Sequence, residues 1–284
     1  MIYVSTGGFS NRTAYDTACN FFDANIFCCE LSGGLFDKNI KDSLTKLKSK
    51  GDIQLHNYFP PPEKPFVMNL ASDDPNIVKR TVEHIKKAIE LASELGTNKY
   101  SFHAGFLVDP KVDELGRRVK KKLLFDRAEA LNRFINNVNN LALYAKKLST
   151  ILLIENNVLS HNNYKHFGKN PFLMVDEKEC EYVMKKTEEN VFLLVDVAHL
   201  KVSAHSLGFD KLKFLKSVYP WIRACHLSDN DGLSDSNEPV REDSWFWPHI
   251  PNDLDYYSLE VYGKNPMELV EQVKLTQSML KIDY

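Results

Sequence analysis

Residues that bind metal ions and transfer protons recur in this sequence at one kind of position. Each ends, or nearly ends, a short apolar run, as Glu155 ends the run 151–155 and Asp196 ends the run 191–196. The full set is His56, His103, Glu155, Asp196, His226 and Glu260. Any one of them alone would be explained as a helix cap or a hydrogen-bonded strand end. Together, imidazole and carboxylate suit zinc, manganese, iron or cobalt, so the set predicts one site for a divalent metal ion.

Eight short apolar runs, separated mostly by segments of helical periodicity, supply these positions. They span residues 2–5, 26–31, 53–56, 99–103, 151–155, 191–196, 223–227 and 257–261. A helix between successive strands returns the chain to the same end of the sheet, so the strands pair in parallel. In a closed parallel barrel, the carboxyl ends of all strands surround one mouth. We therefore expect an α/β fold, a (β/α)8 TIM barrel with the six polar residues at its mouth.

The expected helices are well marked, with one exception. Asp74 and Pro75 are typical of a helix start, and the apolar residues that follow recur at spacings of three and four up to Gly96. Residues 228–256, between the seventh and eighth strands, are rich in Asp, Ser, Asn, Pro and Trp and have little helical periodicity. We expect an irregular, helix-poor connection there. No repeat or linker divides the chain, so residues 1–284 are expected to form a single barrel domain.

Composition and charge exclude several other classes of protein. A chain of 284 residues suits one barrel of roughly 250 residues. The formal net charge is -2, whereas a nucleic-acid-binding protein typically carries an excess of basic residues, so the charge argues against that class. No run approaches the roughly 20 apolar residues of a membrane span, and the first residues do not resemble a signal peptide. The five cysteines suggest no disulfide framework. We expect a cytoplasmic protein that acts on a small molecule, with an oligomeric state that the sequence leaves open.

Four short motifs carry a resemblance to a known superfamily. They are Ser101-Phe102-His103-Ala104-Gly105, Ile154-Glu155-Asn156, Asp196-Val197-Ala198-His199 and His226-Leu227-Ser228-Asp229-Asn230-Asp231-Gly232. In this order and spacing they resemble the xylose-isomerase-like TIM barrel superfamily. That superfamily contains sugar-phosphate isomerases and epimerases as well as AP endonuclease family 2, whose members are similar to endonuclease IV. The resemblance covers nearly the whole chain, from the first strand to Glu260.

The resemblance implies roles for the matching residues. In the epimerases of the superfamily, a Glu, an Asp, a His and a final Glu hold one divalent ion, and these match Glu155, Asp196, His226 and Glu260 here. Glu155 and Glu260 would also be the catalytic residues, transferring protons on opposite faces of the substrate carbon. His199 would contact a substrate oxygen. Zinc or manganese is the expected ion, with magnesium or cobalt as alternatives.

The endonuclease branch implies further ions. His56 and His103 match two histidine ligands of an additional ion there, and the sequence leaves open whether they bind metal or substrate in this protein. An Asp-x-His pair completes a third metal site in many relatives. Here Asp235 is followed by Asn237 in place of the histidine. Because an amide oxygen is a poor zinc ligand, this departure argues against a three-zinc centre and leaves Asp235 as a predicted substrate contact.

The chemistry of the ligand set independently favours an isomerase. Removal of a proton next to a carbonyl needs a base and an electrophile on the carbonyl oxygen. Trp245 and Trp247 are candidates to stack on a sugar ring, and a hydrophobic plug in place of the missing helix is the equally open alternative. We expect a divalent-metal-dependent sugar or sugar-phosphate isomerase or epimerase with a small-molecule carbohydrate substrate. The alternatives are an abasic-site phosphodiester hydrolase and a barrel that binds without turnover, against which two opposed carboxylates argue.

Overall fold

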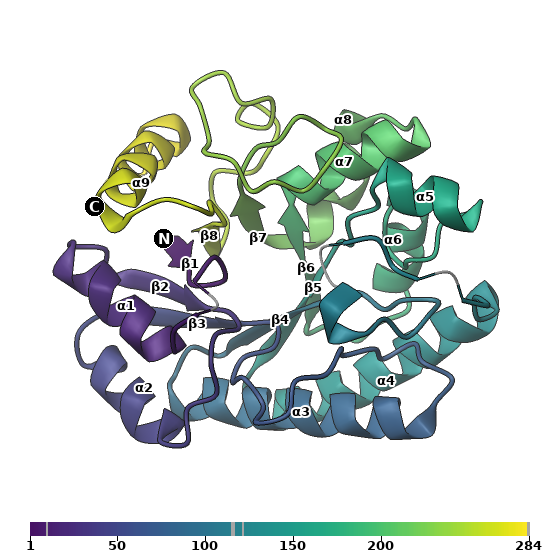
Figure 1. The fold of residues 1–284 in the computed structure, drawn as a ribbon, viewed down its shortest axis with the longest axis horizontal. Helices are drawn as coiled ribbons and strands as arrows, with labels where there is room; N and C mark the ends of the chain where they lie inside the picture. Colours follow the sequence, from purple (N-terminus) through teal and green to yellow (C-terminus); the bar gives the residue numbers. More distant parts are fainter. Residues whose placement is uncertain (10, 115–116, 121, 283–284) are drawn as a thin grey trace.

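Eight parallel strands close into a barrel in which each strand pairs with its neighbours in sequence (Figure 1). This computed structural model describes residues 1–9, 11–114, 117–120 and 122–282. The strands are β1 (Ile2–Ser5), β2 (Cys28–Leu31), β3 (Asp52–His56), β4 (Lys99–His103), β5 (Ile151–Glu155), β6 (Val191–Asp196), β7 (Ile222–Leu227) and β8 (Tyr256–Leu259). β1 also pairs with β8, which closes the ring. The predicted α/β fold and parallel barrel are confirmed. The observed strand ends lie within two residues of the expected ones, and four strands match at both ends.

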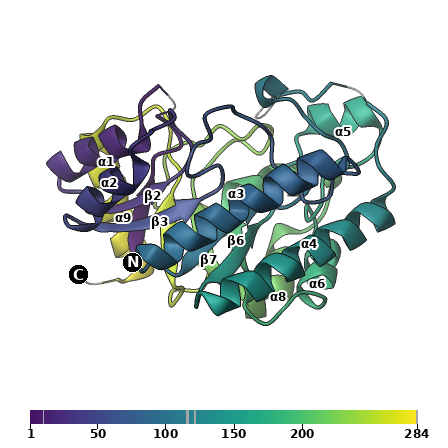
Figure 2. The ribbon, with the colours of Figure 1, turned by 90° about the horizontal axis from the view of Figure 1, so that it is seen from below.

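Helices surround the barrel, as Figures 1 and 2 show. They are α1 (Ala14–Asp23), α2 (Ile40–Lys48), α3 (Pro75–Glu94), α4 (Arg127–Lys147), α5 (His161–Phe167), α6 (Glu177–Met184), α7 (Val197–Leu207), α8 (Lys211–Val218) and α9 (Pro266–Leu280), with short 3-10 turns at Val112–Glu114 and Tyr219–Trp221. α3 begins as predicted, since Asp74 accepts a hydrogen bond from the backbone of Asn76 and Pro75 occupies the first turn. Among the described residues, no helix is long and apolar enough to cross a membrane.

The strands divide their side chains between two cores. On β5, Leu152 and Ile154 are fully buried in the large core between the strands and the helices, whereas Leu153 belongs to a separate cluster. That inner cluster consists of Tyr3, Leu153, Leu194, Ala224 and Tyr256. Because side chains alternate along a strand, Glu155 points to the same side as Leu153. The inner cluster therefore forms an apolar floor inside the barrel, and the residues two positions further along the strands lie above it.

The connection between β7 and β8 contains no helix over residues 228–255, all of which the structure describes. An isolated antiparallel bridge pairs Asp229 with Glu238 and folds this segment back on itself. The ammonium group of Lys201 on α7 lies 2.6 Å from an Asp229 oxygen, and the hydroxyl group of Ser244 donates to the other oxygen at 2.8 Å. The predicted helix-poor connection is confirmed, and these contacts anchor it to the barrel.

Candidate metal centre

The carboxyl ends of the strands bring acidic and imidazole side chains into one cluster. His56, His103, Glu155 and Asp196 are the last residues of β3, β4, β5 and β6, in that order. His226 is the penultimate residue of β7, and Glu260 directly follows β8. All six sequence-predicted positions therefore lie at the same end of the barrel, and only His103 among them is partly exposed.

Four of these residues form the densest part of the cluster. One ligand atom each of Glu155, Asp196, His226 and Glu260 lies within 4.8 Å of the others. The Nδ1 atom of His226 is 3.5 Å from Glu155 Oε1, 3.8 Å from Asp196 Oδ2 and 3.6 Å from Glu260 Oε2. One imidazole nitrogen thus faces three carboxylates that come from three other strands or strand ends.

Glu155 also joins this group to a second one. Its Oε2 atom lies 3.3 Å from Nε2 of His56 and 3.2 Å from Nδ1 of His103. Its Oε1 atom faces the other way, 3.5 Å from Nδ1 of His226. Ligand atoms of His56, His103 and Glu155 also lie within 4.8 Å of one another. The two oxygens of Glu155 therefore face two neighbouring positions at which an ion could bind.

The unsatisfied polar atoms of the cluster test whether it suits a cation. Both carboxylate oxygens of Glu155, Oδ2 of Asp196 and Nδ1 of His226 are buried and make no hydrogen bond within the described structure. Buried polar atoms without partners are destabilising and rare in folded proteins. Asp196 uses its other oxygen, Oδ1, to cap α7 by accepting from the backbone of His199 at 2.7 Å. The atoms left without partners are the ones that face one another, so the donor set fits a divalent ion.

In the absence of a cation, the carboxylates of the cluster repel one another. Burial raises the pKa of Glu260 to about 8, and the neighbouring carboxylates of Glu155 and Asp196 add to this effect. Burial also raises the pKa of Asp196 to about 6, although His199 partly offsets it. A positive ion favours the ionised form of every carboxylate near it, so a bound cation would relieve this repulsion.

The pKa values of the histidines also reflect two opposing effects, burial and the attraction of neighbouring carboxylates. Burial lowers the pKa of His56 to about 4, against the attraction of Glu155. For His226, burial also favours the neutral ring, but the carboxylates of Glu30, Glu260 and Glu155 outweigh it and hold the pKa well above its ordinary value. Glu155 has the reverse balance, since surrounding imidazoles hold its pKa well below the ordinary value in spite of burial.

His199 and Asp235 lie at the edge of the cluster. His199 Nε2 is 3.2 Å from Asp235 Oδ2, and its Nδ1 atom is 3.0 Å from the backbone oxygen of Asn156 and 3.3 Å from Glu155 Oε1. Asp235 keeps a quarter of its side chain exposed. Asn237, which replaces the histidine of the Asp-x-His pattern, is buried, and its backbone oxygen accepts from the backbone of Tyr262 at 3.0 Å. The roles of His199 and Asp235 as substrate contacts stay a prediction.

Trp245 and Trp247 lie in the irregular connection between β7 and β8. The indole nitrogen of Trp247 donates to the backbone oxygen of Arg241 at 2.7 Å, and its ring lies 4.6 Å from that of Phe246. The ammonium group of Lys211 lies 4.9 Å from the centre of the Trp245 ring. Trp247 is also buried in the large core, and Trp245 is partly buried against it, as the hydrophobic-plug alternative expects. The stacking role of the two tryptophans stays a prediction.

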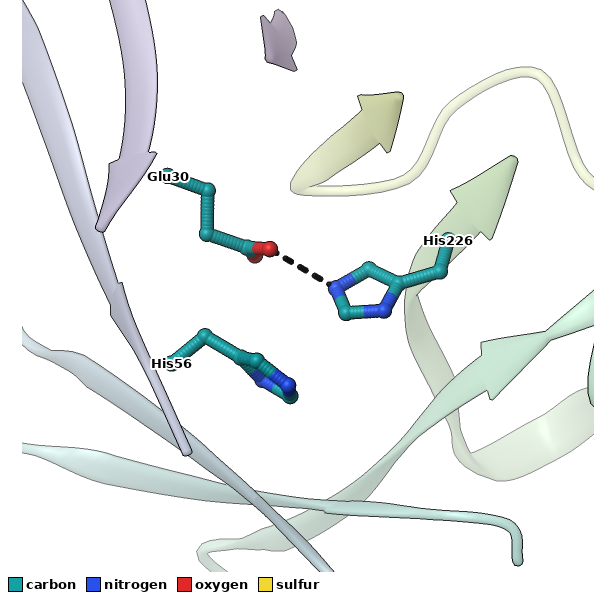
Figure 3. Close-up of side chains that lie close together, drawn as sticks. All are labelled: Glu30, His56 and His226. Carbon is teal, nitrogen blue, oxygen red and sulfur yellow. Dashed lines mark ion pairs between the residues drawn. The ribbon is translucent and has the colours of Figure 1, made fainter. Parts of the chain in front are cut away.

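Two residues of the centre were missed by the sequence analysis. Glu30 is the penultimate residue of β2, and its Oε1 atom lies 2.9 Å from Nε2 of His226, with His56 beside both (Figure 3). Ser5 ends β1, and its hydroxyl group donates to Glu260 Oε1 at 3.2 Å. A carboxylate inside an otherwise apolar run was the signal for Glu30.

The structure is a closed parallel barrel with a buried cluster that could hold a metal ion. Comparison with known proteins identifies its family. The chain belongs to the xylose isomerase-like TIM barrel family, whose model matches residues 18–260. Among the curated proteins, none matches this sequence.

Similar solved structures cover almost the whole chain. A D-tagatose 3-epimerase-like protein has a TM-score of 0.73 and 19% identity, covering 99% of this chain and 97% of its own. A protein from Thermus thermophilus, soaked with ZnCl2, has a TM-score of 0.64 and 18% identity, covering 98% of each chain. An L-ribulose 3-epimerase has a TM-score of 0.66 and 16% identity, covering 96% of this chain and 86% of its own. At these identities, the similarity establishes the fold alone.

Proposed function

We propose that this protein is a divalent-metal-dependent isomerase or epimerase of a sugar or sugar phosphate, a single barrel domain that acts in the cytoplasm. The observation that carries the proposal is the buried cluster of Glu155, Asp196, His226 and Glu260, whose ligand atoms lie within 4.8 Å of one another. The epimerases among the similar structures support the same class of reaction.

The four residues of that cluster would hold the ion, with zinc or manganese preferred to magnesium or cobalt because one ligand is imidazole. When bound, a divalent ion supplies an electrophile that polarises a carbonyl oxygen of the substrate. His56 and His103 face the other oxygen of Glu155 and are available for a second ion or for substrate hydroxyl groups.

The protein's own carboxylates would move the proton. Glu155 reaches the cluster from β5 and Glu260 from the end of β8, with β6 and β7 between them in the barrel. A substrate carbon held between these two residues would meet one carboxylate on each face. One would remove the proton from the carbon next to the carbonyl, and the other would return a proton on the opposite face. His199, held by Asp235, would orient a substrate oxygen.

Metal analysis and proton exchange test this proposal directly. The purified protein should contain a divalent ion that a chelator removes. The loaded protein should incorporate deuterium from heavy water into the carbon next to the carbonyl of at least one ketose or ketose phosphate. A protein that binds the ion but neither exchanges nor converts any sugar in a broad panel would contradict the proposed reaction.

An abasic-site phosphodiester hydrolase is the second candidate. The observation in its favour is the position beside Glu155 Oε2, where His56 and His103 both lie within 3.3 Å. The net charge of -2 and Asn237 in place of a histidine ligand oppose it. Incubation with a duplex that contains one abasic site separates the two candidates. We expect no incision at enzyme concentrations that convert the sugar substrate, and one tightly bound ion rather than three.

A further inference from the structure

Glu30 is a buried carboxylate that the proposed reaction does not use. Its side chain is fully buried on β2, and neither of its oxygens makes a hydrogen bond within the described structure. A carboxylate in such a position is destabilising unless a charged or polar partner compensates. Its close neighbour is Nε2 of His226 at 2.9 Å, on a ring that is also fully buried (Figure 3).

The two ring nitrogens of His226 have different surroundings. Nδ1 faces the carboxylates of the four-residue cluster at 3.5 to 3.8 Å, whereas Nε2 faces Glu30 on the opposite side of the ring. A neutral imidazole carries one proton, and only the nitrogen without the proton can bind a metal ion. An ionised carboxylate can only accept, so Glu30 favours the tautomer that keeps the proton on Nε2. Nδ1 is then left bare on the side of the cluster.

We propose that Glu30 is a positioning residue of the metal centre, which fixes the ring orientation and the tautomer of His226 so that Nδ1 binds the ion. Carboxylates that hold the second nitrogen of a histidine ligand raise its basicity and its affinity for the metal. The inference rests on the proposed function only in requiring that the cluster binds a divalent ion. It does not depend on which substrate is converted.

A different role for Glu30 would be to bind an ion itself. Ligand atoms of Glu30, His56 and His226 also lie within 4.8 Å of one another. However, His226 would then bind through Nε2 and could not also serve the four-residue cluster without losing both ring protons. In His56, Nδ1 lies 2.9 Å from the hydroxyl oxygen of Ser101, and Nε2 lies 3.3 Å from Glu155 Oε2. The nitrogens that an ion beside Glu30 would need therefore have other partners.

The test compares Glu30→Gln with a matched control, Gln54→Leu. Gln54 is a buried polar residue that pairs in register with Glu30 on the neighbouring strand. Zinc affinity is measured by competition with a chromophoric chelator, and the ring nitrogens of His226 are observed by nitrogen-15 NMR in the zinc-loaded protein. Glu30→Gln should weaken zinc binding by roughly 10- to 100-fold and speed the exchange of the Nε2 proton with water. Gln54→Leu should leave both quantities close to those of the wild type.

The outcomes separate this inference from the proposed function. Unchanged affinity and an unchanged Nε2 proton in Glu30→Gln would overturn the inference, and so would the loss of one whole ion per chain, since Glu30 would then be a ligand. A wild type that binds no divalent ion would overturn it as well. A wild type that binds zinc as expected but converts no sugar would refute only the proposed function.

If Glu30→Gln does not fold, Glu30→Asp replaces it. That variant should keep the Nε2 proton and bind zinc with intermediate affinity, and wild-type affinity would count against the inference.

Discussion

The barrel interior contains two levels with opposite chemistry, built on the same strands. The lower level, made of Tyr3, Leu153, Leu194, Ala224 and Tyr256, is apolar, and the rings of Tyr3 and Tyr256 meet edge to face at 5.6 Å. The upper level begins two residues further along those strands and contains the charged cluster. Both levels are buried, but only the upper one leaves carboxylate oxygens without hydrogen bonds in the described structure.

This difference indicates a division of work between the two levels. Apolar side chains in the lower level gain free energy on burial, of about 1.5–3 kcal/mol for a large aliphatic residue. The upper level costs stability, because its carboxylates lie buried close together and several of their oxygens have no hydrogen-bond partner among the described residues. The floor also excludes water from below, so that charges above it interact more strongly than they would in solvent.

The largest expected effect is on turnover. Glu155→Gln and Glu260→Gln each keep the size of the side chain and one coordinating oxygen but cannot transfer a proton. Either change should reduce turnover of the sugar substrate by roughly 10²- to 10⁴-fold. Rates are compared with enough added metal to fill the site, because each residue is also a proposed ligand. A fully loaded variant that turns over at the wild-type rate would show that its glutamate acts only as a ligand.

Zinc binding should depend much more on His226 than on Asn237. His226 is the one imidazole in the four-residue group. Asn237 offers only an amide, which is a poor zinc ligand. His226→Ala should weaken zinc binding by more than the roughly 100-fold that loss of a supporting residue can cause. Asn237→Ala should leave most of the zinc bound. Metal analysis after dialysis gives the comparison, and equal occupancy in the two variants would argue against the four-residue site.

A change in the floor should show the reverse pattern. Leu153→Ala removes a fully buried side chain from the inner cluster and should lower the free energy of unfolding by about 2–5 kcal/mol. Below its unfolding temperature, this variant should still bind zinc with near wild-type affinity. Urea unfolding of the metal-free protein measures the first quantity, and chelator competition measures the second. If Leu153→Ala lost zinc as His226→Ala does, the two levels would not be independent.

The sequence indicates which upper-level residues lie close together, because most of them stand at or next to the ends of apolar runs. His56, His103, Glu155 and Asp196 each interrupt a hydrophobic pattern at a strand end, and parallel pairing brings such ends together. Glu30 was missed because a short, largely buried strand does not reveal which of its residues point inward.

Contacts made by closure of the barrel are the other part that the sequence could not supply. Ser5 and Glu260 are 255 positions apart, and they meet only because β1 pairs with β8. The neighbours of Trp245 and Trp247 in the helix-poor connection also could not be predicted from the sequence. Their type allows both stacking on a sugar and packing in the core, and only the fold of residues 228–255 determines their neighbours.

The smallest expected effect, counted per pH unit, is a pH dependence that belongs to the upper level alone. Burial and neighbouring carboxylates raise the pKa of Glu260 from its ordinary value of 4.5 to about 8. Between these values, the folded protein holds a proton on Glu260 that the unfolded chain has released, so this residue makes the folded state less stable as the pH rises. The contribution is at most about 1.4 kcal/mol per pH unit.

The free energy of unfolding of the metal-free wild type, relative to Glu260→Gln, should therefore fall from pH 5 to pH 8. Urea unfolding in the presence of a chelator measures this difference. With saturating zinc the trend should disappear above about pH 5, because the ion keeps Glu260 ionised and the folded and unfolded states then hold the same number of protons on this residue. Parallel pH profiles for the two metal-free proteins would mean that Glu260 is not the group that opposes folding in the cluster.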